Sequence, residues 1–168
     1  MNWVVAGVQW LHVLLGITWF GAALYNALIL VPSITPMSLG EQRRIGRAIG
    51  ARAFTVLRPV ALAVITLGVL RGTVFGPIKD LAQLTSPYGL TWLVALVFAI
   101  GAYFWAERVI GPALDRMNAI PEAAALDSDG RPSAELEAAV ANVKRKSILE
   151  LGFFFVIFTC MILMRFGL

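Results

Sequence analysis

Apolar residues in this chain gather in four long runs separated by polar connectors. The runs cover about residues 3–31, 54–74, 90–110 and 148–166. A membrane-spanning helix needs roughly 20 mostly apolar residues, and each run is long enough. Because a backbone in lipid must satisfy its own hydrogen bonds, each run is predicted to be a helix. The pattern predicts an all-α fold, an integral membrane four-helix bundle that forms a single domain over residues 1–168.

The charges in the connectors predict the orientation of this bundle. Connector 33–52 contains four arginines, and connector 111–147 contains five lysines and arginines. The connector between the second and third runs contains Lys79 and Asp80, with Arg71 close by. Cytoplasmic loops carry an excess of basic residues. The first and third connectors are therefore predicted to be cytoplasmic, and both termini to face outward (N-out/C-out).

The third connector is predicted to divide into a loop and a helix. The stretch "PEAAALDSDGRPS" is typical of an exposed loop. Ser133 is followed by Glu135 and Glu137, and acidic residues favour the first turn of a helix. We expect a helix that starts at Ser133 and continues into the last run, as a cytoplasmic extension of the last span.

Composition supports the membrane interpretation and changes the meaning of the net charge. The chain is 59% hydrophobic and 14% charged, whereas soluble domains carry about 25% charged residues. The net charge of +4 could suit nucleic acid, but the basic residues fall mostly at the ends of the apolar runs. The predicted partner is therefore the lipid bilayer and not nucleic acid. Small residues in the runs also make the chain a candidate homo-oligomer.

One face of the first predicted helix collects polar and small residues. Steps of three and four from Gln9 meet His12, Gly16, Trp19, Ala23 and Asn26. Leu14, Ile17 and Leu28 lie on the opposite face, which suits lipid. His12, the only histidine, is therefore predicted to point into the bundle, in the outer half of the membrane. The glycines predicted to be helix-contact positions are Gly16, Gly21, Gly68 and Gly101.

Ionisable residues near the cytoplasmic edge form a second group. Arg58 opens the second run, Glu107 ends the third and Glu150 begins the fourth, so we predict a structural charge cluster. Arg58 either extends to the interface or pairs with Glu107 or Glu150, because intramembrane charges usually pair.

Two roles are open for His12 on the residues alone. It is either a core histidine hydrogen-bonded to a carbonyl or to Gln9, or a ligand of haem or metal. A second axial ligand would be Met161, Met164, Cys160, water or His12 of a second subunit. The sequence contains no CxxC, HExxH, Walker or GxGxxG motif, and it does not decide whether the protein is an enzyme.

The stretch "LHVLLGITWFGAALYNALILVPS" resembles a group of four-helix membrane proteins. The group includes the haem-b-dependent bacterial protoporphyrinogen oxidase of the J type and the copper-resistance D-type proteins. The resemblance is carried by His12, a six-residue gap, then "WFGA" with Trp19, followed by Tyr25. It implies a haem b held by His12, and a bacterial cytoplasmic (inner) membrane location. Met161 and Trp19 complete the candidate cofactor site.

The chain departs from the oxidase pattern in three places. Ser33 stands where the oxidases have a second histidine, and Leu149 where they have an asparagine. The third run has apolar or aromatic residues around Leu96 and Phe104 instead of a lysine and a histidine. Glu150 and Lys146 do match the pattern. The missing groups are those needed to bind and deprotonate a tetrapyrrole, which argues against the oxidase reaction.

Three functions therefore compete. The first is a membrane haem-binding or redox protein that uses His12. The second is a copper-handling protein, since soft sulfur ligands and His12 suit Cu(I). The third is a non-catalytic membrane scaffold or subunit in which His12 is structural.

Overall fold

Four long helices make up most of the structure. The computed structural model describes residues 2–127 and 129–168. Within them, four helices are long enough and apolar enough to cross a membrane: Trp3–Ile34, Leu39–Gly72, Pro87–Ala119 and Ala134–Arg165. The described residues contain no strand. The protein is an all-α membrane helical bundle, which confirms the fold that the hydropathy pattern predicted.

Two of the four helices contain a π-helical turn. The first helix consists of α1 (Trp3–Tyr25), the π turn η1 (Asn26–Leu30) and α2 (Val31–Ile34). The third consists of α4 (Pro87–Trp105), the π turn η3 (Ala106–Ile110) and α5 (Gly111–Ala119). The second is α3 (Leu39–Gly72) and the fourth is α7 (Ala134–Arg165). Short elements η2 (Ala82–Thr85) and α6 (Glu122–Ala125) lie in the connectors.

The helices run further than the predicted spans. Each has 32 to 34 residues, which is roughly 50 Å at about 1.5 Å per residue, against ~30 Å for the hydrocarbon core. Most of the arginine-rich connector 33–52 is helical, because α3 begins at Leu39. Ser38 caps α3, and Glu41 accepts a hydrogen bond from the Ser38 backbone N–H at 3.1 Å. Helical structure therefore extends well beyond the apolar stretch.

The start of α7 matches the sequence prediction. Ser133 is the N-cap residue, and its hydroxyl accepts a hydrogen bond from the Leu136 N–H at 3.3 Å. Glu135 and Glu137 occupy the first turn, and the helix continues without a break to Arg165.

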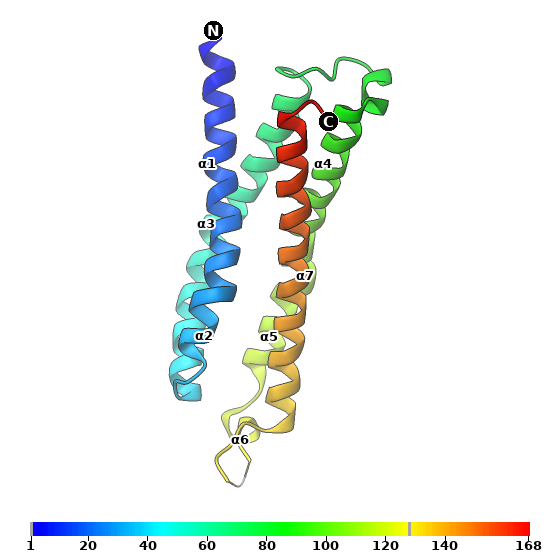
Figure 1. The fold of residues 1–168 in the computed structure, drawn as a ribbon. Helices are drawn as coiled ribbons and strands as arrows, with labels where there is room; N and C mark the ends of the chain where they lie inside the picture. The colour runs from blue at the N-terminus through cyan, green and yellow to red at the C-terminus, as the bar shows by residue number, and fades with distance from the viewer. Residues whose placement is uncertain (1, 128) are drawn as a thin grey trace.

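Both chain termini lie at the same end of the bundle (Figure 1).

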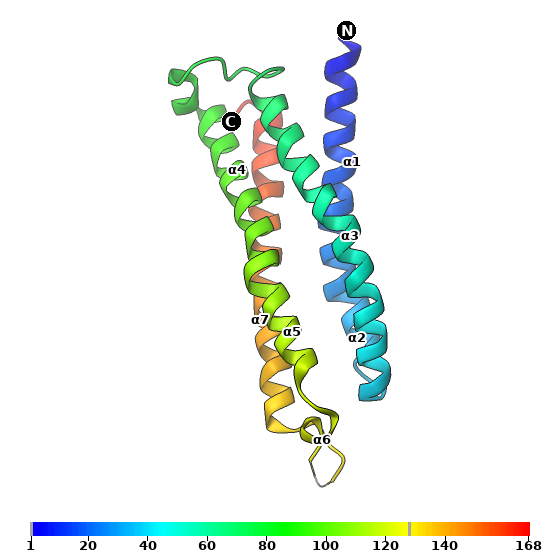
Figure 2. The same cartoon turned by 180° about the vertical axis from the view of Figure 1, so that it is seen from behind.

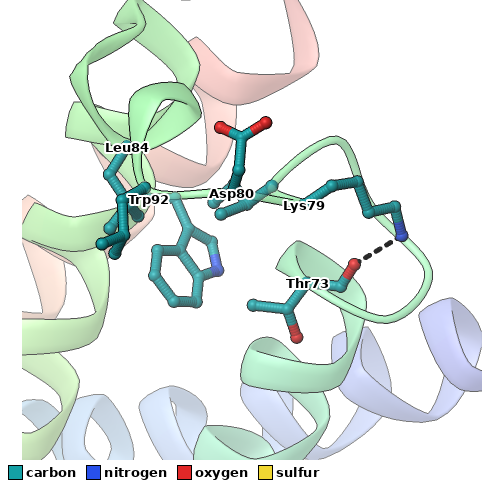
Figure 3. A pocket seen from close by; sticks show the side chains of 7 residues that line it. Thr73, Lys79, Asp80, Leu84 and Trp92 are labelled. Carbon is teal, nitrogen blue, oxygen red and sulfur yellow. Dashed lines mark hydrogen bonds between the residues drawn. The ribbon is translucent and has the colours of Figure 1, made fainter.

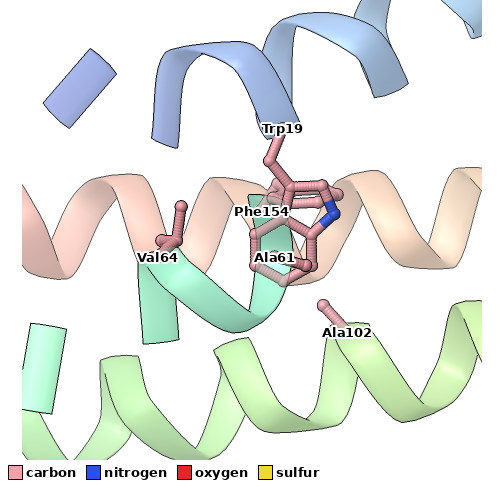
Figure 4. Packing of buried hydrophobic residues seen from close by; sticks show 5 residues of the cluster. All are labelled: Trp19, Ala61, Val64, Ala102 and Phe154. Carbon is pink, nitrogen blue, oxygen red and sulfur yellow. The ribbon is translucent and has the colours of Figure 1, made fainter. Parts of the chain in front are cut away.

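The bundle consists of two closely packed helix pairs (Figures 1 and 2). α1 packs mainly against α3, and α4 packs mainly against α7. A central cluster of buried residues joins the pairs (Figure 4), and its members are Trp19, Ala61, Val64, Ala102 and Phe154. The Trp19 and Phe154 rings lie edge to face, with centroids 4.9 Å apart. The small alanines let the helix backbones approach closely at this level.

A second cluster closes the opposite end of the bundle from the termini. Ile120, Ala125 and Leu136 are buried together, and Leu39 at the start of α3 packs against them. Elsewhere many large apolar side chains are exposed on the helices. Such a surface suits a lipid environment.

Candidate functional site

His12 lies between α1 and α3. Its side chain is buried, with 9% exposed, and its ring atom Nδ1 lies 3.1 Å from the carbonyl oxygen of Val64. Because a carbonyl only accepts, Nδ1 donates this hydrogen bond. In a neutral imidazole the other ring nitrogen, Nε2, then carries the lone pair. The α3 backbone thus fixes both the tautomer and the orientation of the ring.

Gly68 makes room for this ring one turn further along α3. A Cβ atom at position 68 would lie 3.1 Å from Cε1 of His12. The Gly68 carbonyl oxygen accepts a hydrogen bond from the indole N–H of Trp92, on α4, at 3.3 Å. One short segment of α3 therefore links His12 on α1 with Trp92 on α4.

Gln9 has a different partner from His12. Its side-chain oxygen accepts a hydrogen bond from Nε of Arg71 at 2.8 Å. Arg71 also donates from Nη1 to the Phe75 carbonyl oxygen at 3.1 Å. Of the two structural partners considered for His12, the structure shows the backbone carbonyl. Gln9 instead holds a cationic side chain one turn nearer the end of the bundle that carries the termini.

The inward and lipid-facing sides predicted for the first helix agree with the burial of residues along α1. They do not agree at Asn26, which follows α1. His12 and Trp19 are its buried residues, while Ile17 on the opposite face is 64% exposed. Asn26, predicted to face inward, is exposed. It follows the last residue of α1 and begins the π turn η1.

The glycine predictions were right at one position and wrong at three. Gly68 contacts the His12 ring, as a helix-contact position should. A Cβ atom at Gly16, Gly21 or Gly101 would meet nothing within 4 Å in the described structure. These three glycines therefore do not mediate close helix packing within the chain.

The other candidate cofactor residues, Trp19 and Met161, lie on α1 and α7. Trp19 belongs to the central cluster, and Met161 is half-buried. Trp19 touches Phe154. Trp19 follows His12 by seven positions, and Met161 follows Phe154 by seven positions. Because α1 and α7 run in opposite directions, His12 and Met161 both lie about 10 Å from that contact, on the side toward the termini.

Sulfur ligands are also present near this level of α7. Cys160 is a free, buried cysteine, and Met164 is half-buried. The described residues contain no group of three or more histidine, cysteine, aspartate or glutamate side chains that could hold a metal ion.

The predicted charge cluster reduces to a pair. Arg58 binds both carboxylate oxygens of Glu107, with Nε to Oε1 at 3.1 Å and Nη2 to Oε2. The Arg58 side chain is 50% exposed and that of Glu107 is 15% exposed. The guanidinium also lies over the Phe54 ring at 4.8 Å. This is the one ion pair in the described residues, so Glu150 lies outside it.

Sequence reasoning missed Val64 and Trp92, the two residues that tie this site together. The available signal was the series of small residues in the second run, Ala61, Gly68 and Gly72, which marks the interior face of α3. No protein-family model, curated protein or solved structure matched this chain when it was compared with each of these.

Proposed function

We propose that this integral membrane protein binds haem b through Nε2 of His12. The observation that carries the proposal is the hydrogen bond from Nδ1 to the Val64 carbonyl oxygen. Histidines that bind metals almost always donate their other ring N–H to a carbonyl, a carboxylate or water. This second contact orients the ring and leaves the ligating nitrogen available. The resemblance of the first helix to the haem-b group supports the same assignment.

Met161 is the second side chain that would hold the haem. The Trp19–Phe154 contact and the equal spacing of His12 and Met161 from it support this choice. A haem with histidine and methionine ligands supplies one-electron redox chemistry at a raised potential. The residues around it would hold the macrocycle within the apolar part of the bundle. The proposed setting is a bacterial cytoplasmic membrane, with His12 in the outer half.

The proposal covers haem binding and not tetrapyrrole oxidation. Ser33 and Leu149 replace polar groups of the oxidase pattern, and neither side chain offers a base. Within the described structure, the hydrogen bonds near His12 involve backbone carbonyls, Gln9, Arg71 and Trp92. None of these groups is a suitable proton acceptor at neutral pH.

The test is the absorption spectrum of the full-length protein, purified after expression with ample haem supply. We expect a Soret band that is lost in His12→Gly and restored in that variant by added imidazole. Rescue by imidazole identifies a ligand, because a purely structural histidine would not bring the band back. Leu14→Ala is the matched control, since Leu14 lies on the exposed face of the same helix.

The remaining outcomes would overturn the proposal. A colourless protein that stays folded favours the scaffold interpretation. Copper retained without haem favours the copper-handling interpretation, and elemental analysis detects it. If haem binds and Met161→Leu leaves the reduced spectrum unchanged, Met161 is not the second ligand.

A further inference from the structure

A pocket of about 440 Å³ opens at the end of the bundle that carries the termini. It lies where α3 ends and the connector to α4 begins (Figure 3). Ile78, Leu84 and Trp92 form its apolar side, and Lys79 and Asp80 form its charged rim. The apolar run of the third span begins beside it, at about residue 90. The pocket therefore lies at the level of the membrane–water interface.

Lys79 is held in place without being neutralised. Its Nζ donates to the carbonyl oxygens of Thr73 at 2.7 Å and Val74 at 2.8 Å. These carbonyls lie just past the end of α3, where no further helical N–H reaches them. An ammonium group has three donors, so one N–H and the full positive charge remain available at the rim.

Asp80 is likewise held by a hydrogen bond and not by an ion pair. One carboxylate oxygen accepts a hydrogen bond from the Gln83 N–H at 2.9 Å. The Asp80 carboxylate and the Lys79 ammonium extend in different directions (Figure 3), and they form no ion pair. The rim thus presents two separate charged groups, and both residues are exposed. The Lys79 ammonium is a hydrogen-bond donor, and the Asp80 carboxylate is a hydrogen-bond acceptor.

We infer that this pocket binds the headgroup of a zwitterionic phospholipid with a primary ammonium, such as phosphatidylethanolamine. The phosphate matches Lys79, and the ammonium donates charge-assisted hydrogen bonds to Asp80. A phosphatidylcholine headgroup has no N–H to donate, and a phosphatidylglycerol headgroup has hydroxyl donors but no cation to pair with the Asp80 carboxylate. Leu81, which is 82% exposed, offers apolar contact to the acyl chains. The site is independent of the haem proposal.

The test is lipid binding to the delipidated full-length protein, measured by native mass spectrometry. The probes are dioleoyl phosphatidylethanolamine, phosphatidylcholine and phosphatidylglycerol. We expect phosphatidylethanolamine to bind about 10-fold more tightly than phosphatidylcholine, the effect of one good charge-assisted hydrogen bond. Asp80→Asn keeps an oxygen for the Gln83 N–H and removes the charge. The ratio of phosphatidylethanolamine affinity to phosphatidylcholine affinity should therefore fall to about one.

The second charge gives an independent readout. Lys79→Gln should weaken the binding of both zwitterionic lipids by the same factor. Lys79→Arg should bind them as the wild-type protein does, because it keeps the charge. Asp80→Glu should keep the preference if Asp80→Asn proves unstable. Asp115→Asn is the matched control, since Asp115 is exposed on α5 at the other end of the molecule.

Three results would overturn the inference. Equal affinity of the wild-type protein for phosphatidylethanolamine and phosphatidylcholine would remove the role of the ammonium. A preference that persists in Asp80→Asn would place the lipid elsewhere. Displacement of the lipid by free phosphoethanolamine at the same concentration would show that the site recognises a soluble headgroup rather than a membrane lipid.

Discussion

The contact between His12 and Gly68 sets how closely α1 and α3 approach. Replacing Gly68 by alanine places a methyl group 3.1 Å from Cε1 of His12, so the ring or the helix must move. We expect Gly68→Ala to lower the free energy of unfolding by about 1–3 kcal/mol, as overpacking does. It should also weaken haem retention. Thermal unfolding in detergent and the Soret absorbance measure the two effects.

Gly16→Ala is the control for this substitution. Its new methyl group would meet nothing within 4 Å, and alanine favours the helix over glycine by about 1 kcal/mol. The unfolding midpoint should therefore stay the same or rise. If both variants lose the same stability, the His12–Gly68 contact does not control the packing.

Glu107 and Glu150 differ in whether a partner compensates their charge. Glu107 has Arg58, whereas Glu150 forms no ion pair in the described structure. We expect Glu107→Gln to reduce the free energy of unfolding by about 1 kcal/mol, a modest loss because Arg58 is half exposed. Glu150→Gln should leave the free energy of unfolding unchanged or raise it, because a half-buried carboxylate without a charged partner loses hydration at a cost. Denaturant unfolding of both variants would show this order, and the reverse order would contradict it.

At the scale of single residues, the sequence predicted which side chains are buried better than it predicted their hydrogen-bond partners. The spacing of Gln9, His12 and Trp19 placed His12 on the inward face, and it is buried. Its hydrogen-bond acceptor is a backbone carbonyl of Val64. Every residue carries a backbone carbonyl, so the sequence does not indicate which carbonyl will accept the hydrogen bond from His12. The exact register between α1 and α3 decides it, and that register arises from packing.

A single capping residue marks the start of each of the four long helices, because its side chain accepts a hydrogen bond from a backbone N–H of the first turn. These residues are Asn2, Ser38, Ser86 and Ser133. The Ser38 hydroxyl accepts from the Glu41 N–H at 3.4 Å, and Glu41 accepts from the Ser38 N–H in return. Ser38→Ala should cost about 1 kcal/mol of helix stability. The loss should appear as faster hydrogen exchange in the first turns of α3, with α7 unchanged. Equal exchange in wild type and variant would mean that the cap does not hold this end.

At the scale of elements, the existence of the four helices was predictable and their lengths were not. Hydropathy detects only the apolar part of a helix, so the arginine-rich start of α3 was assigned to a connector. The α7 extension was predicted because Ser133 and its acidic first turn are a helix signal in themselves. Each π turn ends two residues before a proline, Pro32 or Pro112. A proline has no N–H and therefore signals a local irregularity in a helix, but it does not specify a π turn.

The charges of the connectors predict how the whole molecule is oriented in the membrane. Both termini lie at one end, and the basic connectors lie at the other (Figure 1). We expect a periplasmic reporter such as alkaline phosphatase to be active when fused after Leu168, and a fusion near Gly130 to be inactive. Replacing the four arginines of residues 43–52 by glutamine should weaken this bias. Activity only at Gly130 would reverse the predicted topology.

The pairing of α1 with α3 also sets the order in which the site can be assembled during synthesis. Val64 and Gly68, which hold the His12 ring, both precede residue 72. The ring can therefore reach its final position as soon as the first two spans have left the ribosome, before α4 and α7 are made. Trp92 and Phe154 are synthesised later, when the ring of His12, the proposed ligand, is already oriented. Early capture of a cofactor by the nascent chain is thus compatible with this fold.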